Sequence, residues 1–127
     1  KEVLRLVVMD EVSMVPADMF HLIDARLRDV LGIQKPFGGV VMLCIGDFLQ
    51  IPPVRGTSLS YAALYADDRM KGLTPNEVSG GVLWRKAKRI KLERLMRTTD
   101  TTHTERIREM RRTKTFTRAT PRPATTW

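Results

Sequence analysis

Two adjacent carboxylates, Asp10 and Glu11, follow directly on a short apolar run at residues 3–9. The run is rich in β-branched residues and hardly alternates with polar ones, which predicts a buried, parallel strand. Ligands of open parallel sheets bind beyond the carboxyl ends of the strands. Because strand side chains alternate, we expect the two carboxylates to point in different directions. One can hold hydrated Mg²⁺ and the other can orient a water for attack on a phosphate, although many such pairs are only solvated strand ends.

A second polar group follows another apolar run, residues 40–45. Gln50 lies shortly after this run, so it should sit beside the same crevice as the acid pair. Its neutral amide can donate to a phosphate oxygen or hold a water. The prolines that follow, Pro52 and Pro53, stiffen the backbone and can pass a small shift onward to a bound strand. Placement beside two carboxylates favours a functional role over that of an ordinary loop residue.

A helical pattern separates the two apolar runs. Apolar residues recur at helical spacing from residue 19 to residue 31, and Gly32 marks a stop. Asp24 and Arg28 are expected on the outer face, where their spacing makes a favourable pair. Strand, helix and strand in this order predict a right-handed βαβ unit with a parallel sheet. The sequence also predicts a short helix at 58–66, turns at 71–81, a strand around 90–95 and a helix at 104–112.

Several single residues favour structural roles. Ser13 is expected to fix the turn after the first strand through local backbone hydrogen bonds. Phe48 and Trp84 could stack on a base, but core packing is the commoner fate of lone aromatics. Cys44 is the sole cysteine and lies in an apolar run, which predicts a buried, inert thiol and no internal disulfide. His21 and His103 lack companions at metal-ligand spacing.

The net charge of +8 is unevenly distributed. Residues 1–84 contain 8 Lys or Arg and 10 Asp or Glu, whereas residues 85–127 contain 14 and 4, a net of −2 against +10. Such asymmetry predicts a polyanionic partner for the C-terminal part, or simply a solvated basic face. The longest apolar run is far too short to span a bilayer, so no membrane partner is expected.

Four segments together resemble one known family. They are DEVSM at residues 10–14, PFGG at 36–39, GDFLQIPPV at 46–54 and LERLMR at 92–97, with Asp100 behind the last. In this order and spacing they resemble the Pif1-like family of superfamily 1 DNA helicases, over roughly residues 3–112. The resemblance implies an α/β fold, namely part of a RecA-like P-loop NTPase domain with a parallel sheet.

The resemblance also implies roles for four residues. Asp10 would be the Mg²⁺ carboxylate and Glu11 the catalytic base. Gln50 would sense the γ-phosphate of ATP and couple nucleotide state to DNA, and Arg97 would place a positive charge at the γ-phosphate. Thr98 stands where this family often has Gln, which puts the local geometry around Arg97 in doubt.

The implied activity is that of an ATP-dependent DNA helicase of the 5′–3′ type, with Mg²⁺ as cofactor. Single-stranded DNA and duplex junctions would be its partners. Roles in DNA repair, recombination and telomere maintenance are implied, as is an intracellular location, the nucleus or a mitochondrion in a eukaryote. Two alternatives stay open: a non-catalytic basic module that binds nucleic acid through residues 85–118, and a decayed copy of a mobile-element helicase.

The phosphate-binding half of such a site is missing from these residues. No Gly is followed by Lys, so the Walker A pattern GxxxxGK[ST] is absent, and its strand is expected to be absent too. The chain starts with Lys1, which suggests a piece of a longer protein. Residues 1–112 are therefore predicted to be a partial first motor domain with exposed apolar surface and unpaired sheet edges. Residues 113–127, rich in Thr and Pro, are predicted to form a disordered tail.

We predict that the 127-residue chain alone binds ATP weakly or not at all. The Walker A loop supplies the backbone amides and the lysine that hold the β- and γ-phosphates, and nothing in this sequence replaces them. Titration of the purified chain with a fluorescent ATP analogue, with and without Mg²⁺, measures this directly. Micromolar, Mg²⁺-dependent affinity would contradict the prediction.

Overall fold

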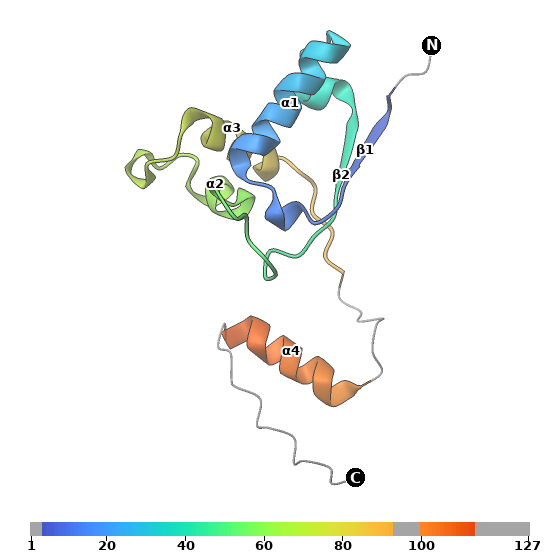
Figure 1. Ribbon diagram of the computed structural model, residues 1–127, viewed down its shortest axis with the longest axis vertical. Coiled ribbons are helices and arrows are strands. Elements are labelled where there is room, and N and C mark those ends of the chain that lie inside the picture. The colour runs from blue at the N-terminus through green and yellow to red at the C-terminus, as the bar shows by residue number, and fades with distance from the viewer. Residues whose placement is uncertain (1–3, 93–99, 114–127) are drawn as a thin grey trace. The chain divides into compact units, whose positions relative to one another are not determined.

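The computed structural model describes residues 4–92 and 100–113. The chain divides into two compact units, Lys1–Arg89 and Ile90–Trp127, which are treated separately (Figure 1). The elements of the first unit are β1 (Leu6–Met9), η1 (Val12–Met14), α1 (Ala17–Leu31), η2 (Pro36–Gly39), β2 (Val41–Cys44), α2 (Leu59–Tyr65), η3 (Arg69–Lys71) and α3 (Pro75–Arg85). The second unit contains α4 (Thr101–Thr113).

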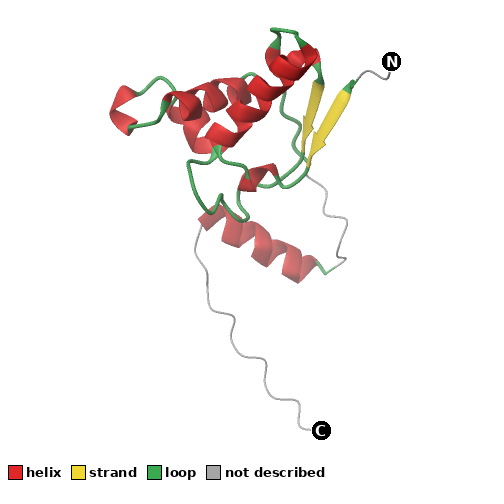
Figure 2. Ribbon diagram, turned by 45° about the horizontal axis from the view of Figure 1, so that its top comes forward, coloured by secondary structure: helices red, strands yellow, loops and turns green. Residues whose placement is uncertain are grey.

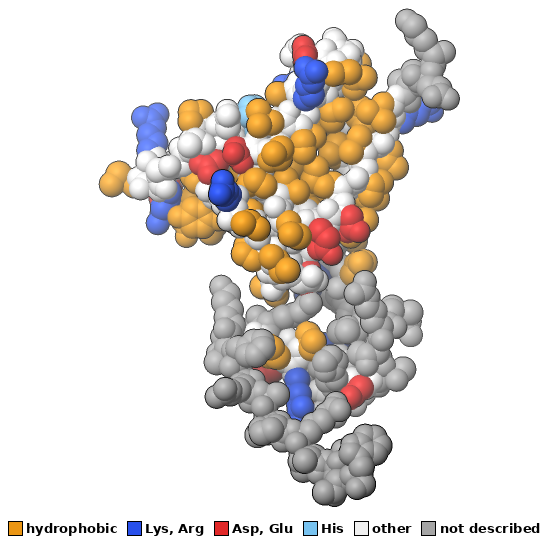
Figure 3. Space-filling model, viewed as in Figure 1, with side chains coloured by type: hydrophobic (Ala, Val, Ile, Leu, Met, Phe, Trp, Pro, Cys, Tyr) orange, Lys and Arg blue, Asp and Glu red, His pale blue; other side chains and the backbone are white. Residues whose placement is uncertain are grey.

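β1 and β2 pair in parallel, with Leu6 opposite Val41 and Met9 opposite Cys44. α1 connects them, so the predicted α/β arrangement with a parallel βαβ unit is confirmed. The prediction of a buried strand is wrong, because alternate side chains on both strands are about half exposed. In the described residues the sheet has two strands, and so narrow a sheet does not have both of its faces buried. The expected exposed apolar surface is confirmed, and Figure 3 shows hydrophobic side chains over much of the visible face of this unit.

α1 begins and ends where its sequence indicates. The N–H of Ala17, which has no partner within the helix, donates to the carbonyl of Thr57 at 2.8 Å. Gly32 ends the helix in the left-handed region, at φ 66°, and its N–H donates to the carbonyls of Arg28 and Asp29. The segment that carries Thr57 is therefore fixed to the first turn of α1.

Asp24 is buried and not on the outer face, which corrects the prediction from helical periodicity. Its side chain is 2% exposed, and it accepts hydrogen bonds from Arg28 Nε at 3.0 Å and from the N–H of Phe37. The predicted pairing with Arg28 is confirmed, with Nη2 and Oδ2 2.7 Å apart. Phe37 has a φ of 54°, which bulky residues rarely adopt. The buried carboxylate thus holds the turn at η2, which leads into β2.

α3 replaces the turns predicted for residues 71–81. Thr74 and Glu77 form a capping box, in which the Glu77 N–H donates to Thr74 Oγ1 and the Thr74 N–H donates to Glu77 Oε2. Pro75 occupies the first helical turn, where its missing N–H costs nothing. Hydrogen bonds from the Thr57 side chain, and then from the Thr74 backbone, hold the pKa of Glu77 below its usual value. The helix continues through two consecutive glycines, Gly80 and Gly81.

Those two glycines allow the helices to pack closely. A Cβ on Gly80 would lie 1.9 Å from the carbonyl oxygen of Ala17 in α1. A Cβ on Gly81 would lie 2.4 Å from the carbonyl oxygen of Ala62 in α2. The backbone of α3 therefore contacts the backbones of both neighbouring helices. The two glycines are needed because they have no side chain in these contacts, and they do not bend the chain.

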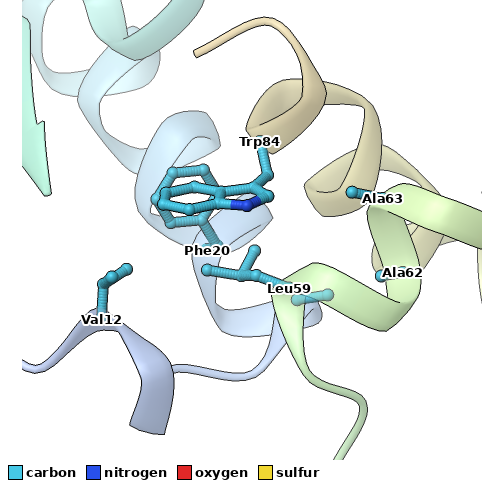
Figure 4. Close-up of a cluster of buried hydrophobic side chains, with 7 residues drawn as sticks. Val12, Phe20, Leu59, Ala62, Ala63 and Trp84 are labelled. Carbon is cyan, nitrogen blue, oxygen red and sulfur yellow. The ribbon is translucent and has the colours of Figure 1, made fainter. Parts of the chain in front are cut away.

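A cluster of buried hydrophobic side chains that includes Phe20 and Trp84 forms the centre of the first unit (Figure 4). The ring of Trp84 meets the edges of Phe20 and Phe48 at centroid distances of 5.8 and 5.4 Å, and Phe20 in turn meets Phe37 at 5.2 Å. Val12 packs against the same cluster and is 1% exposed. The expectation that Phe48 and Trp84 pack in the core is confirmed. These contacts join α1 and α3 to the segments on either side of β2.

The later predictions are met only in part. The predicted helices at 58–66 and 104–112 correspond to α2 and α4. Ile90, Lys91 and Leu92 are exposed and belong to no strand, which contradicts the first part of the strand predicted around 90–95. The rest of that segment and residues 114–127 of the predicted tail lie outside the described residues. No helix in the described part of the chain is long and apolar enough to cross a membrane.

Replacing Gly80 by alanine should destabilise the chain, although alanine normally stabilises a helix interior by up to about 1 kcal/mol. The new methyl group would overlap the Ala17 carbonyl oxygen, and neither backbone can move without separating α1 from α3. Urea denaturation followed by Trp84 fluorescence measures the change. Asn76→Ala, at an exposed position of the same helix, is the matched control. A Gly80→Ala variant as stable as the parent chain would contradict this packing.

Asp24→Ala should lower the free energy of unfolding by about 3 kcal/mol, because it leaves the Phe37 N–H and the half-buried Arg28 guanidinium without their acceptor. Asp29→Ala on the same helix is the matched control. Its pair with Arg26 is exposed on both sides and should contribute at most about 0.5 kcal/mol. Equal losses in the two variants, measured by the same denaturation, would refute the role given to Asp24.

Candidate functional site

The carboxyl ends of the two strands emerge side by side (Figure 2). Beyond the last strand pair, the N–H of Ile45 donates to the carbonyl of Met9 at 2.8 Å. The N–H of Val12 then donates to the carbonyl of Ile45 at 2.9 Å. The turn that carries Asp10 and Glu11 is thus hydrogen-bonded to the segment that leads to Gln50. Asp10 and Glu11 lie at the carboxyl edge of the sheet as expected, and Gln50 follows on the segment that is hydrogen-bonded to their turn.

Asp10 and Glu11 lie beyond the strand and not on it, since β1 ends at Met9. Strand alternation therefore does not set their directions, which corrects the sequence-based reason for separating them. The N–H of Glu11 donates to Asp10 Oδ1 at 2.8 Å, and Glu11 adopts a left-handed backbone with φ 51° and ψ 41°. Both side chains are exposed. A non-glycine residue in this conformation is uncommon, and such residues cluster at functional sites.

Gln50 sits in a turn organised by Asp47, a residue that the sequence analysis did not assign to the site. Asp47 Oδ1 accepts the N–H of Leu49 at 3.0 Å, and the Asp47 carbonyl accepts the N–H of Gln50 at 2.9 Å. Gln50 Nε2 donates to Asp47 Oδ2 at 3.5 Å. A side chain that accepts the N–H two residues further on, as that of Asp47 does, defines an Asx turn. Aspartate favours such turns, so the residue type at position 47 could have indicated this turn from sequence. The exposed amide of Gln50 is thereby tied to its own turn.

The Gln50 segment is anchored on both sides. Phe48, within the turn, packs its ring against Trp84 of α3. After the two prolines, Thr57 accepts the Ala17 N–H, and Ser58 forms a bridge with Pro16. Between these anchors the apolar side chains of Ile51 and Val54 are 63% and 88% exposed. The expectation that the rigid prolines pass on a shift stays a prediction.

Ser13 does not fix the turn as expected. Its Oγ is buried and, within the described part of the chain, has no hydrogen-bond partner. The backbone of its own turn supplies the contacts instead, through Met14 N–H donating to the Glu11 carbonyl. His21 Nδ1 is likewise buried without a partner in residues 4–92 and 100–113.

The basic segment after α3 is exposed from Arg85 to Leu92. Arg85 itself is paired, with Nη1 2.7 Å from Asp67 Oδ2, and this contact holds the pKa of Asp67 below its usual value. Arg97 lies outside the described residues, so its predicted positive charge at the γ-phosphate stays a prediction. The structure joins the turn of Asp10 and Glu11 to the segment that leads to Gln50.

The residues present suit a magnesium ion that keeps most of its water. No group of three or more His, Cys, Asp or Glu within the described ranges is arranged to enclose a metal. Mg²⁺ commonly takes one or two carboxylates together with water and substrate phosphates, and the exposed Asp10 carboxylate offers such a ligand. Cys44 is not a competing ligand, because it is half-buried and burial raises the pKa of its thiol.

Comparison with known proteins places this chain in a family. The family model for PIF1-like helicases matches residues 2–119. The human ATP-dependent DNA helicase PIF1 is 40% identical over 83 residues, which cover 65% of this chain and 13% of that protein. The mouse PIF1 helicase is 54% identical over 50 residues, covering 39% of this chain and 8% of the relative. This chain therefore spans a small part of the curated relatives it matches.

A solved structure of Pif1 helicase from Bacteroides in complex with ADP-AlF3 and ssDNA is 45% identical, with a TM-score of 0.39 over 40% of this chain and 12% of that one. The ATP-dependent DNA helicase PIF7 of Trypanosoma brucei brucei is 48% identical over 50 residues, covering 39% of this chain and 5% of the relative. Since the family model extends over nearly all of the sequence, this chain belongs to the PIF1-like helicase family.

Proposed function

We propose that this chain forms the Mg²⁺- and water-handling part of the ATPase centre in an ATP-dependent DNA helicase. Family membership and the helicase names of the relatives support the activity. The observation that carries the proposal is the hydrogen bonding at one sheet edge between the turn with Asp10 and Glu11 and the segment that leads from β2 to Gln50. Residues 1–112 are taken as part of the first RecA-like motor domain of a longer protein.

Each turn has a distinct task in ATP hydrolysis. Asp10 holds the magnesium ion, which when bound neutralises charge on the phosphates of ATP. The exposed Glu11 carboxylate accepts a proton from the attacking water and orients it toward the γ-phosphorus. Its left-handed backbone, fixed by the Asp10 side chain, sets the direction of that carboxylate. Because the Asp10 and Glu11 side chains are exposed, a substrate that approaches from solvent can contact both carboxylates.

Gln50 reports the nucleotide state. Its amide contacts the γ-phosphate or the attacking water, and Asp47 restrains it by holding the same turn. Loss of the γ-phosphate would change the hydrogen bonds of this amide. The anchors at Phe48 and Thr57 then carry the change to α3 and α1. Arg97 adds positive charge at the γ-phosphate in this proposal.

The partners proposed for the longer protein are ATP, single-stranded DNA and duplex junctions. Movement in the 5′–3′ direction and work in repair, recombination and telomere maintenance belong to the same proposal, as does an intracellular location in the nucleus or a mitochondrion. The resemblance to Pif1-like helicases supports these features. Walker A and the second motor domain would come from other parts of the protein.

A non-catalytic basic module is the second candidate. The net charge of +10 in residues 85–127 favours it, since such a segment can bind nucleic acid through phosphate contacts alone. The pairing of Arg85 with Asp67 removes one of these charges from that surface. ATP-stimulated release of single-stranded DNA by a full-length protein that contains this segment would separate the two, because a basic module without an ATPase does not respond to nucleotide.

In a full-length helicase that contains this segment, Glu11→Gln should lower kcat for ATP by about 10²–10⁴-fold, the usual contribution of a general base. The substitution keeps the size of the side chain, so ATP KM and DNA affinity should change little. A phosphate-release assay with saturating single-stranded DNA measures the effect, with Asp29→Asn on the outer face of α1 as the control. Near-normal turnover in the Glu11 variant would show that another group accepts the proton.

A further inference from the structure

The two turns of the site approach each other closely at Gly46, two residues after β2 ends at Cys44. A Cβ on this residue would lie 2.9 Å from the Val12 backbone nitrogen and 3.3 Å from that of Ser13. It would also lie 3.1 Å from Val12 Cγ1. The backbone on one side of the site therefore rests directly on the backbone that follows Glu11 on the other.

The glycine is required for space and not for its backbone angles. Gly46 does not have a positive φ, so alanine could adopt its conformation without strain. The obstacle is the backbone of Val12 and Ser13, which cannot rotate aside as a flexible side chain can. Val12 is 1% exposed and Ser13 is 2% exposed, so packed atoms on their far side leave no space into which this backbone could move. A methyl group at position 46 must therefore displace the backbone at Val12 and Ser13, and the displacement passes to the residues next to them in the sequence.

Glu11 is the residue whose backbone conformation would change as a result. It directly precedes Val12, is exposed, and is held in a left-handed conformation. Two hydrogen bonds fix it there: its own N–H to Asp10 Oδ1 at 2.8 Å, and Val12 N–H to the Ile45 carbonyl at 2.9 Å. The second bond spans the same contact that the Gly46 methyl group would enter.

We propose that Gly46 is a positioning residue for Glu11. Its missing Cβ lets the two turns stack and so fixes the Glu11 carboxylate relative to Gln50. The inference rests on the proposed function, since it takes Glu11 as the group that orients the attacking water. A displacement of about 1 Å at a reacting group can cost about 10²-fold in rate. Gly46 thus acts on catalysis through Glu11 without itself touching the substrate.

A structural test needs no catalytic activity. Amide hydrogen exchange of Val12 in the 127-residue chain reports its bond to the Ile45 carbonyl. Gly46→Ala should speed exchange of the Val12 amide at least tenfold, while amides in the middle of α1 keep their protection. Unchanged exchange at Val12 would overturn the proposal, because the two turns would then accept the methyl group without separating.

A kinetic test uses a full-length helicase that contains this segment. Gly46→Ala should lower kcat for ATP by about 10–100-fold, with ATP KM and DNA affinity within twofold of the parent. Gly72→Asn is the matched glycine substitution, because nothing lies within 4 Å of a Cβ there and asparagine tolerates its left-handed backbone. Equal rates in the Gly46 and Gly72 variants would overturn the positioning role, as would a rise in KM with unchanged kcat.

Glu11→Gln in the same helicase separates the two claims. If kcat is low for Glu11→Gln and normal for Gly46→Ala, only the inference about Gly46 is rejected. If kcat is normal for Glu11→Gln, the catalytic role on which that inference rests is rejected. If Gly46→Ala fails to fold in the isolated chain, the kinetic arm in the larger protein still decides. Failure to fold in both would make Gly46 a packing residue of the core and overturn the proposal.

Discussion

The hydrogen bond from the Val12 N–H to the Ile45 carbonyl, 2.9 Å long, continues the pairing of β1 and β2 beyond the last strand residues. Everything proposed for this site depends on that contact. It keeps the turn of Asp10 and Glu11 beside the segment that leads to Gln50. The close approach at Gly46 has the same effect, because only a residue without a Cβ leaves room for the bond. The site is thus built from two backbones in contact, with the reactive side chains on the outside.

The aromatic core extends this constraint into the helices. Val12 and Phe48 lie next to Glu11 and within the Gln50 turn, respectively, and both pack on the cluster around Trp84. α3 can support this cluster because Gly80 and Gly81 bring it against the backbones of α1 and α2. Asp10 and Glu11 therefore have the buried Val12 within two positions, and Gln50 has the partly buried Phe48 two positions away. This arrangement leaves the polar groups free for a ligand while the packing restrains their backbone.

Local patterns in the sequence predicted much of the scaffold. The β-branched run, the helical spacing of residues 19–31 and the glycine stop were sufficient for the βαβ unit, since each acts within a few residues. Long-range contacts were not predictable in this way. Asp24 was placed on the outer face by periodicity, yet its carboxylate is buried because the Phe37 N–H needs an acceptor. Residues 71–81 were predicted to form turns, whereas Gly80 and Gly81 lie within α3 and allow its close contacts with α1 and α2.

For the site, the sequence by itself determined the chemical groups: the Asp10 and Glu11 carboxylates, the Gln50 amide, and their order after two apolar strands. Residue types and short spacings carry that information, because parallel strands place their carboxyl ends at one edge. The tertiary structure alone decided how these groups are held. The left-handed Glu11, the Asp47 turn and the contact at Gly46 each join residues across a turn or between strands. The contact at Gly46 depends on where two separate backbones meet, which no single stretch of sequence specifies, whereas the Glu11 and Asp47 turns are local.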